Sequence, residues 1–162
     1  MQLFPQLDKN ATFLKVQDFF NNVYPEIHRR AGSWGDYNSP TVDDMPKAPS
    51  YGNSSERRMI EHALYGGALY AIRHAMEHCS TVSRAIIKYR YFEGLSNSKV
   101  KSLIGYTGND TYYQKVKSAC AEFADCLEPA CDYYGVSEEI IPDLHVYEKT
   151  GQNQDKHRTS AG

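Results

Sequence analysis

The fold of this chain is decided by residues 81–128, which read TVSRAIIKYRYFEGLSNSKVKSLIGYTGNDTYYQKVKSACAEFADCLE. Apolar side chains recur every three or four residues from Val82 to Glu93, which predicts a first helix with one buried face. Gly94 ends that helix, and Ser96 is a good N-cap for a short second helix that Gly105 ends. The predicted buried residues of these two helices are Val82, Ile86, Tyr89, Phe92, Val100, Leu103 and Ile104.

A third helix follows, and its two faces differ in character. On a helical wheel with Val116 as the origin, one side is apolar and predicted to be buried. The opposite side is polar and its flanks are basic near the helix N-terminus, as in a recognition helix. Asn109 and Asp110 are both suitable N-caps, and Pro129 is expected to end the helix. The predicted buried side comprises Tyr112, Val116, Ala119, Cys120, Phe123 and Leu127.

Positive charge is concentrated in the same stretch. Residues 81–118 contain seven Lys or Arg and two Asp or Glu, a net charge of +5, whereas the whole chain carries −2. Residues 1–80 sum to −1 and residues 119–162 to −6. Local positive charge attracts phosphate whatever the net charge of the chain. The competing interpretation is that these lysines only solvate helix faces, as in many α-helical proteins.

We therefore predict a helix-turn-helix module that binds double-stranded DNA. Gln114 and Asn109 are candidates for reading base edges, and the lysines and Arg84 for holding phosphates. The full predicted set of DNA-binding residues is Arg84, Lys88, Lys99, Asn109, Thr111, Tyr113, Gln114, Lys115, Lys117 and Ser118.

The region before this module is expected to be helical on both sides of a long loop. After an extended arm, a helix opening at Asn10 or Thr12 should run to about Arg30, with a kink or break at Pro25. Residues 32–55 are rich in proline, glycine and serine, and predict a loop that carries apolar anchors. A long helix then runs from Ser54 or Ser55 to about Cys79, in which Gly66-Gly67 indicates a close crossing or a bend. The loop's anchors are Val42, Met45 and Tyr51.

These observations divide the all-α chain into three regions. Residues 1–79 are an N-terminal helical region containing the loop 32–55, residues 80–128 are the DNA-binding domain, and residues 129–162 are a weakly ordered tail. With 162 residues, two full domains are not expected.

Composition argues against several other classes of protein. No paired carboxylates, nucleophile with a base, or phosphate-binding loop is evident, so we expect no enzyme and no cofactor. The four cysteines form no C-x-x-C pair, and the spacing of His74 and His78 beside Cys79 is a weak metal signal. The N-terminus lacks the pattern of a signal peptide and no apolar run spans a bilayer, so a cytoplasmic location without membrane contact is expected.

Three separated motifs resemble the ArpU family over roughly residues 3–127. They are Leu3-Phe4-Pro5, the loop from Ser39-Pro40 to Asn53, and the segment from Tyr112-Tyr113-Gln114-Lys115-Val116-Lys117 to Asp125. The resemblance implies a transcriptional regulator of a phage or prophage, similar to RinA-type activators of late or lysis genes. It also implies a helix-turn-helix similar to the promoter-reading domain of sigma factors. The chain departs from the family pattern at the turn 107–111 and at Cys120.

Two other functions stay open. One is a sigma-like adaptor that mainly binds host RNA polymerase, and the other is a phage small terminase subunit, which also joins a helix-turn-helix to oligomerising helices. A monomer or homodimer in solution would favour a regulator, and a ring of eight or more subunits would favour packaging.

Overall fold

The computed structural model describes residues 3–32 and 53–149, and these residues form helices without a named strand. The all-α prediction is therefore confirmed for this part of the chain. Most of the predicted loop 32–55, including its three apolar anchors, lies outside the described residues. In chain order the helices are α1 (Lys9–Asp18), η1 (Phe19–Val23), α2 (Tyr24–Ala31), α3 (Asn53–His78), α4 (Thr81–Ile87), η4 (Lys88–Phe92), α5 (Asn97–Ile104) and α6 (Asn109–Tyr134).

The N-terminal helix begins earlier than expected and is not broken at Pro25. Asp8 is the N-cap, and its carboxylate accepts a hydrogen bond from the backbone N–H of Ala11 at 3.0 Å. The π-helical turn η1 directly precedes Pro25, which then lies in the first turn of α2. Proline is tolerated at that position because the first turn of a helix needs no backbone donor. The predicted break is therefore replaced by a π-helical turn between two α-helical segments.

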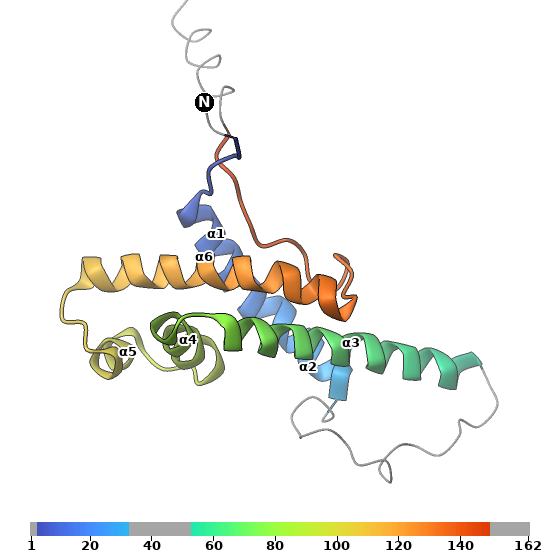
Figure 1. Ribbon diagram of the computed structural model, residues 1–162. Helices are drawn as coiled ribbons and strands as arrows, with labels where there is room; N and C mark the ends of the chain where they lie inside the picture. The colour runs from blue at the N-terminus through green and yellow to red at the C-terminus, as the bar shows by residue number, and fades with distance from the viewer. Residues whose placement is uncertain (1–2, 33–52, 150–162) are drawn as a thin grey trace, which may run out of the picture.

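Helices α3 and α6 run alongside each other in opposite directions and form the most extensive helix pair (Figure 1). A close helix crossing was one of the two reasons given for the paired glycines Gly66-Gly67 in this long helix. Gly67 does lie where α3 meets α6. A Cβ atom added there would approach the carbonyl oxygen of Tyr134 to 3.8 Å, an ordinary contact distance. The crossing would therefore tolerate alanine at this position.

Pro129 does not end α6, contrary to the prediction, because the helix continues to Tyr134 and ends at Gly135. Gly135 has φ 66°, the left-handed conformation that glycine adopts at a helix C-terminus. An interior proline is costly, so packing of the last turns must compensate for it. Ala130, in that part of α6, is 2% exposed.

Residues 136–149, which we call the C-terminal strap, return along the bundle towards the N-terminus (Figure 1). Ile141 and Leu144 are buried in the main core. The backbone N–H of Asp8 donates to the carbonyl of Val146 at 2.8 Å, and the N–H of Glu148 donates to the carbonyl of Gln6 at 2.7 Å. The expectation of a weakly ordered tail is thus wrong for the strap, which buries apolar side chains and pairs with the N-terminal segment.

One hydrophobic core joins residues from all three predicted regions. Phe20 is central to it, because its ring stacks on Tyr91 at a centroid distance of 4.6 Å and contacts Phe123 at 5.0 Å. These contacts connect η1, η4 and α6, so the N-terminal helices support the three helices of residues 81–128. Within the described ranges, no helix combines the length and apolar character needed to cross a membrane.

Candidate nucleic-acid interface

The first helix of the predicted module consists of α4 followed by the π-helical turn η4. Its extent matches the prediction, but its buried face does not. Ile86 is fully buried as expected, whereas Val82 and Phe92 are 39% and 40% exposed, and Ile87 is buried in addition. A π-helical turn contains an extra residue, so Phe92 at the end of η4 is rotated away from the 3.6-residue pattern used for the prediction. Val82 and Ile87 precede this turn, and it does not explain their positions.

The second helix, α5, begins and ends where the sequence predicts. The hydroxyl of Ser96 accepts a hydrogen bond from the N–H of Lys99 at 3.3 Å, which caps the helix N-terminus. Gly105 has φ 82°, and the N–H groups of Gly105 and Tyr106 both donate to the carbonyl of Lys101 at 3.0 Å. Leu103, which was expected to be buried, is 53% exposed.

The third helix, α6, has Gly108 as its N-cap rather than Asn109 or Asp110, which are already its first helical residues. Gly108 has extended backbone geometry and offers no capping side chain. The predicted buried side is confirmed in full, since every one of its residues is at most 2% exposed: Tyr112, Val116, Ala119, Cys120, Phe123 and Leu127.

A hydrogen-bonded clamp fixes the three helices relative to one another. Arg90, on η4, donates to the side-chain oxygen of Asn97 on α5 and to the hydroxyl of Tyr112 on α6, the latter at 3.1 Å. The hydroxyl of Tyr112 in turn donates to Asn97 Oδ1 at 2.8 Å. Because Tyr112 is fully buried, breaking this clamp would leave polar groups without partners in a low-dielectric environment.

Lys101 adds a second connection between α5 and α6. Its ammonium group donates to the side-chain oxygen of Asn109 and lies 5.7 Å from the centroid of the Tyr112 ring. The N-terminus of α6 is thereby held from two sides.

The start of α4 is anchored to α6 through Glu122. Its carboxylate accepts hydrogen bonds from the backbone N–H of Ser80, from the hydroxyl of Ser80 at 3.0 Å and from the hydroxyl of Ser83 at 2.5 Å. Burial opposes ionisation, but these hydrogen bonds stabilise the carboxylate and hold the pKa of Glu122 below its ordinary value.

The residues predicted to contact DNA are placed unequally. Thr111, Gln114 and Lys115 lie exposed on the first turns of α6, whereas Lys117 and Ser118 are half-buried. Asn109 and Tyr113 are exposed but already accept hydrogen bonds, from Lys101 and Asn97 respectively. Lys88 on η4 and Lys99 on α5 are exposed.

Arg84 has a structural role that the sequence did not indicate. Its guanidinium group donates to the carbonyl oxygens of Met76 at 3.0 Å, Glu77 at 2.6 Å and Cys79 at 3.1 Å. Carbonyl groups at the end of α3 have no partner within the helix, so Arg84 caps them. Phosphate contact by Arg84 stays a prediction, and it would have to compete with this cap.

The four cysteines and the pair His74 and His78 show no sign of a metal site in the described residues. All four cysteines are free thiols, and burial raises the pKa of Cys79 to about 12 and of Cys120 to about 11. The rings of His74 and His78 lie 4.3 Å apart, but within the described ranges they gain no third metal-ligating group.

The sequence reasoning missed the residues that support the candidate interface and a separate acidic cluster around His145. Arg90 and Asn97 carry no distinctive spacing, because they meet only through the packing of three helices. For the cluster, a signal was available in the pairing of Asp143 with His145 after an apolar Ile140-Ile141, but the segment was assigned to a weakly ordered tail.

The described residues form an all-helical fold in which the exposed Lys88, Lys99 and Lys115 lie on three consecutive helical segments. No family model matches the chain, and no solved structure does. A curated relative from Enterococcus hirae, named "Putative autolysin regulatory protein ArpU", is 33% identical over 132 residues, which cover 79% of this chain and 94% of the relative. The chain belongs to the ArpU family. The resemblance described from the motifs is thereby confirmed at the level of the family.

Proposed function

We propose that this protein is a DNA-binding transcriptional regulator of a phage or prophage, and that α6 is its recognition helix. The name of the Enterococcus hirae relative gives that protein a regulatory role in autolysis. By extension, the genes regulated here are late or lysis-related genes, as for the RinA-type activators.

The proposal rests on the start of α6, where hydrogen bonds fix the buried side of the helix while polar side chains on the other side are exposed to solvent. Tyr112 is held by Arg90 and Asn97, while the neighbouring Thr111, Gln114 and Lys115 extend into solvent. Rigid placement of exposed polar side chains lowers the entropy lost on binding and fixes their register against base edges. The net charge of +5 in residues 81–118 supplies attraction to the phosphate backbone.

The salt dependence of binding tests this proposal. If Lys115 neutralises a phosphate, Lys115→Ala should weaken binding to every duplex and lower the slope of log Kd against log salt by about one. Lys9→Ala is the matched control, because Lys9 is an exposed lysine on α1, outside the module. Fluorescence anisotropy with a labelled duplex at several salt concentrations measures both. The proposal fails if the wild-type protein shows no salt-dependent duplex binding, or if both variants behave like the wild type.

An adaptor that binds host RNA polymerase is the second candidate, and one observation favours it. The N-terminal half of α3 presents an exposed apolar stripe of Met59, Ile60 and Leu64. Exposed apolar patches commonly mark protein interfaces, and a homodimer would cover this one equally well. Light scattering on the protein alone, and then with polymerase, separates these two partners.

A further inference from the structure

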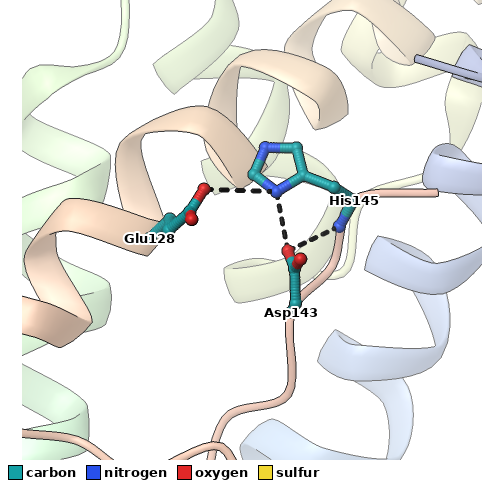
Figure 2. Close-up of side chains that lie close together, drawn as sticks. All are labelled: Glu128, Asp143 and His145. Atoms are coloured by element: carbon teal, nitrogen blue, oxygen red, sulfur yellow. Dashed lines mark hydrogen bonds and ion pairs between the residues drawn. The ribbon is translucent and has the colours of Figure 1, made fainter. Parts of the chain in front are cut away.

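A cluster of metal-ligating groups lies between the C-terminal half of α6 and the C-terminal strap, away from the exposed start of α6 that is proposed to read DNA (Figure 2). His145, on the strap, is 9% exposed and points its ring towards α6. Its Nδ1 atom lies 2.6 Å from Asp143 Oδ1 and 3.6 Å from Glu128 Oε2. Figure 2 shows both carboxylates turned towards the same edge of the imidazole.

The opposite edge of the ring is held by a third carboxylate. Nε2 of His145 lies 2.8 Å from Asp125 Oδ1, on the turn of α6 before Glu128. In metal sites, a ligating histidine usually donates its second N–H to a carboxylate, which fixes the tautomer and the ring orientation. With the proton on Nε2, the lone pair of Nδ1 faces Asp143 and Glu128.

That arrangement needs a positive species between the ring and the two carboxylates. A lone pair directed at a carboxylate oxygen 2.6 Å away is repulsive, so either a proton on Nδ1 or a cation must separate the two atoms. Three carboxylates surround one imidazole, so even a protonated ring leaves an excess of two negative charges. With a neutral ring, a divalent cation would bind the Nδ1 lone pair and reduce the charge of the three carboxylates from −3 to −1.

We propose that His145 Nδ1, Asp143 and Glu128 bind a divalent transition-metal ion, with Zn²⁺ as the best match, and that Asp125 is a positioning residue. Imidazole and carboxylate together suit zinc, at bond lengths of about 2.0–2.2 Å. Tetrahedral bonds of that length place neighbouring ligand atoms about 3.3–3.6 Å apart. The 3.6 Å distance from Nδ1 to Glu128 matches this separation, whereas the 2.6 Å distance to Asp143 is that of a hydrogen bond and would have to lengthen on metal binding. All three ligand atoms lie within 4.8 Å of one another. Shifts of under about 1 Å by exposed carboxylates would complete the geometry.

The surroundings provide room for the remaining coordination position. A cavity of about 100 Å³ borders the cluster and is lined by Glu128 and Asp143 together with residues of the strap. That volume accommodates water, which is the usual fourth ligand where a protein supplies three.

A metal at this position would fasten the strap to α6. The strap also binds α1, because Thr12 Oγ1 accepts from the N–H of Val146 at 3.1 Å. The ion would therefore connect the last described segment of the chain to both helices and should stabilise the fold as a whole.

The test uses the full chain, freed of metal with a chelator and then titrated with ZnCl₂. Isothermal titration calorimetry should give one site per chain for the wild type, and Zn²⁺ should raise the thermal unfolding midpoint. Glu128→Gln, which alters an exposed ligand without changing its size, should weaken Zn²⁺ binding at least about ten-fold. Glu148→Gln is the matched control, because it removes an exposed carboxylate of the same strap outside the cluster.

The positioning role has its own readout. Asp125→Asn keeps all three ligands, so it should lower affinity by about 10- to 100-fold while the visible spectrum of the Co²⁺-loaded protein keeps its tetrahedral bands. The proposal is overturned if the wild type binds no Zn²⁺, or if Glu128→Gln and Glu148→Gln bind it as tightly as the wild type. Retention of one tight site in His145→Ala, which would assign binding to other histidines, also overturns it.

Discussion

Nη1 of Arg90 lies 3.1 Å from the hydroxyl oxygen of Tyr112, and this contact joins the end of the first helix of the module to the start of the third. Asn97 accepts from both residues, so the three side chains form a closed set across η4, α5 and α6. The relative orientation of these helices therefore depends on a polar network anchored at the buried Tyr112 as well as on apolar packing.

Removal of one hydroxyl tests the importance of this clamp. Tyr112→Phe should lower the free energy of unfolding by about 1–3 kcal/mol, because it removes both hydrogen bonds of a buried hydroxyl, one of them from a charged guanidinium group. Tyr113→Phe is the control: it removes an exposed hydroxyl that accepts one bond from Asn97 at 3.3 Å, and it should cost under about 0.5 kcal/mol. Urea unfolding measures both. Equal losses for the two variants would show that the clamp adds no stability.

The anchor formed by Glu122 makes stability depend on pH. Its pKa is lower in the folded than in the unfolded chain, so its contribution is present above pH 4.5 and is lost as the pH falls through the folded value. Glu122→Gln should therefore cost roughly 1 kcal/mol near pH 7, allowing for partial exposure, and progressively less as the pH falls below 4.5. Urea unfolding from pH 7 to pH 3 gives the difference between the two proteins. A difference that is constant over this range would contradict the assignment.

Local signals in the sequence were sufficient for helix order, for both ends of α5 and for the buried side of α6. Ser96 and Gly105 act through their own backbone geometry, and Tyr112, Val116 and Phe123 follow a regular 3.6-residue repeat. These features depend on neighbours in sequence, which is why they could be predicted.

Features that depend on distant contacts could not be predicted. The π-helical turn η4 shifted Phe92 out of the expected face, and the strap owes its order to Ile141 and Leu144 packing into the core. The meeting of His145 with Asp125 and Glu128 likewise requires the strap to return along α6. A helical wheel carries no information about such long-range packing.

Pro129 offers a test of how strongly the end of α6 is held in place. A proline inside a helix costs up to about 3 kcal/mol relative to alanine, and Pro129 is exposed. Pro129→Ala should therefore raise the free energy of unfolding by about 1–3 kcal/mol. Thermal and urea unfolding provide the measurement. A loss of stability would instead mean that the local helix distortion caused by Pro129 is needed for packing of the strap.

The exposed start of α6 is proposed to read DNA sequence. Selecting the duplexes that the protein binds from a random library tests this proposal most directly. The wild-type protein should enrich a defined motif. Gln114→Ala should lose preference at one base pair, because a glutamine amide pairs with adenine in the major groove and discriminates by about 1–3 kcal/mol. Its affinity for non-specific DNA should stay nearly unchanged. If the wild type enriches no motif, sequence reading by α6 is contradicted. If the wild type and Gln114→Ala enrich the same motif with unaltered preference at every position, the role of Gln114 is contradicted.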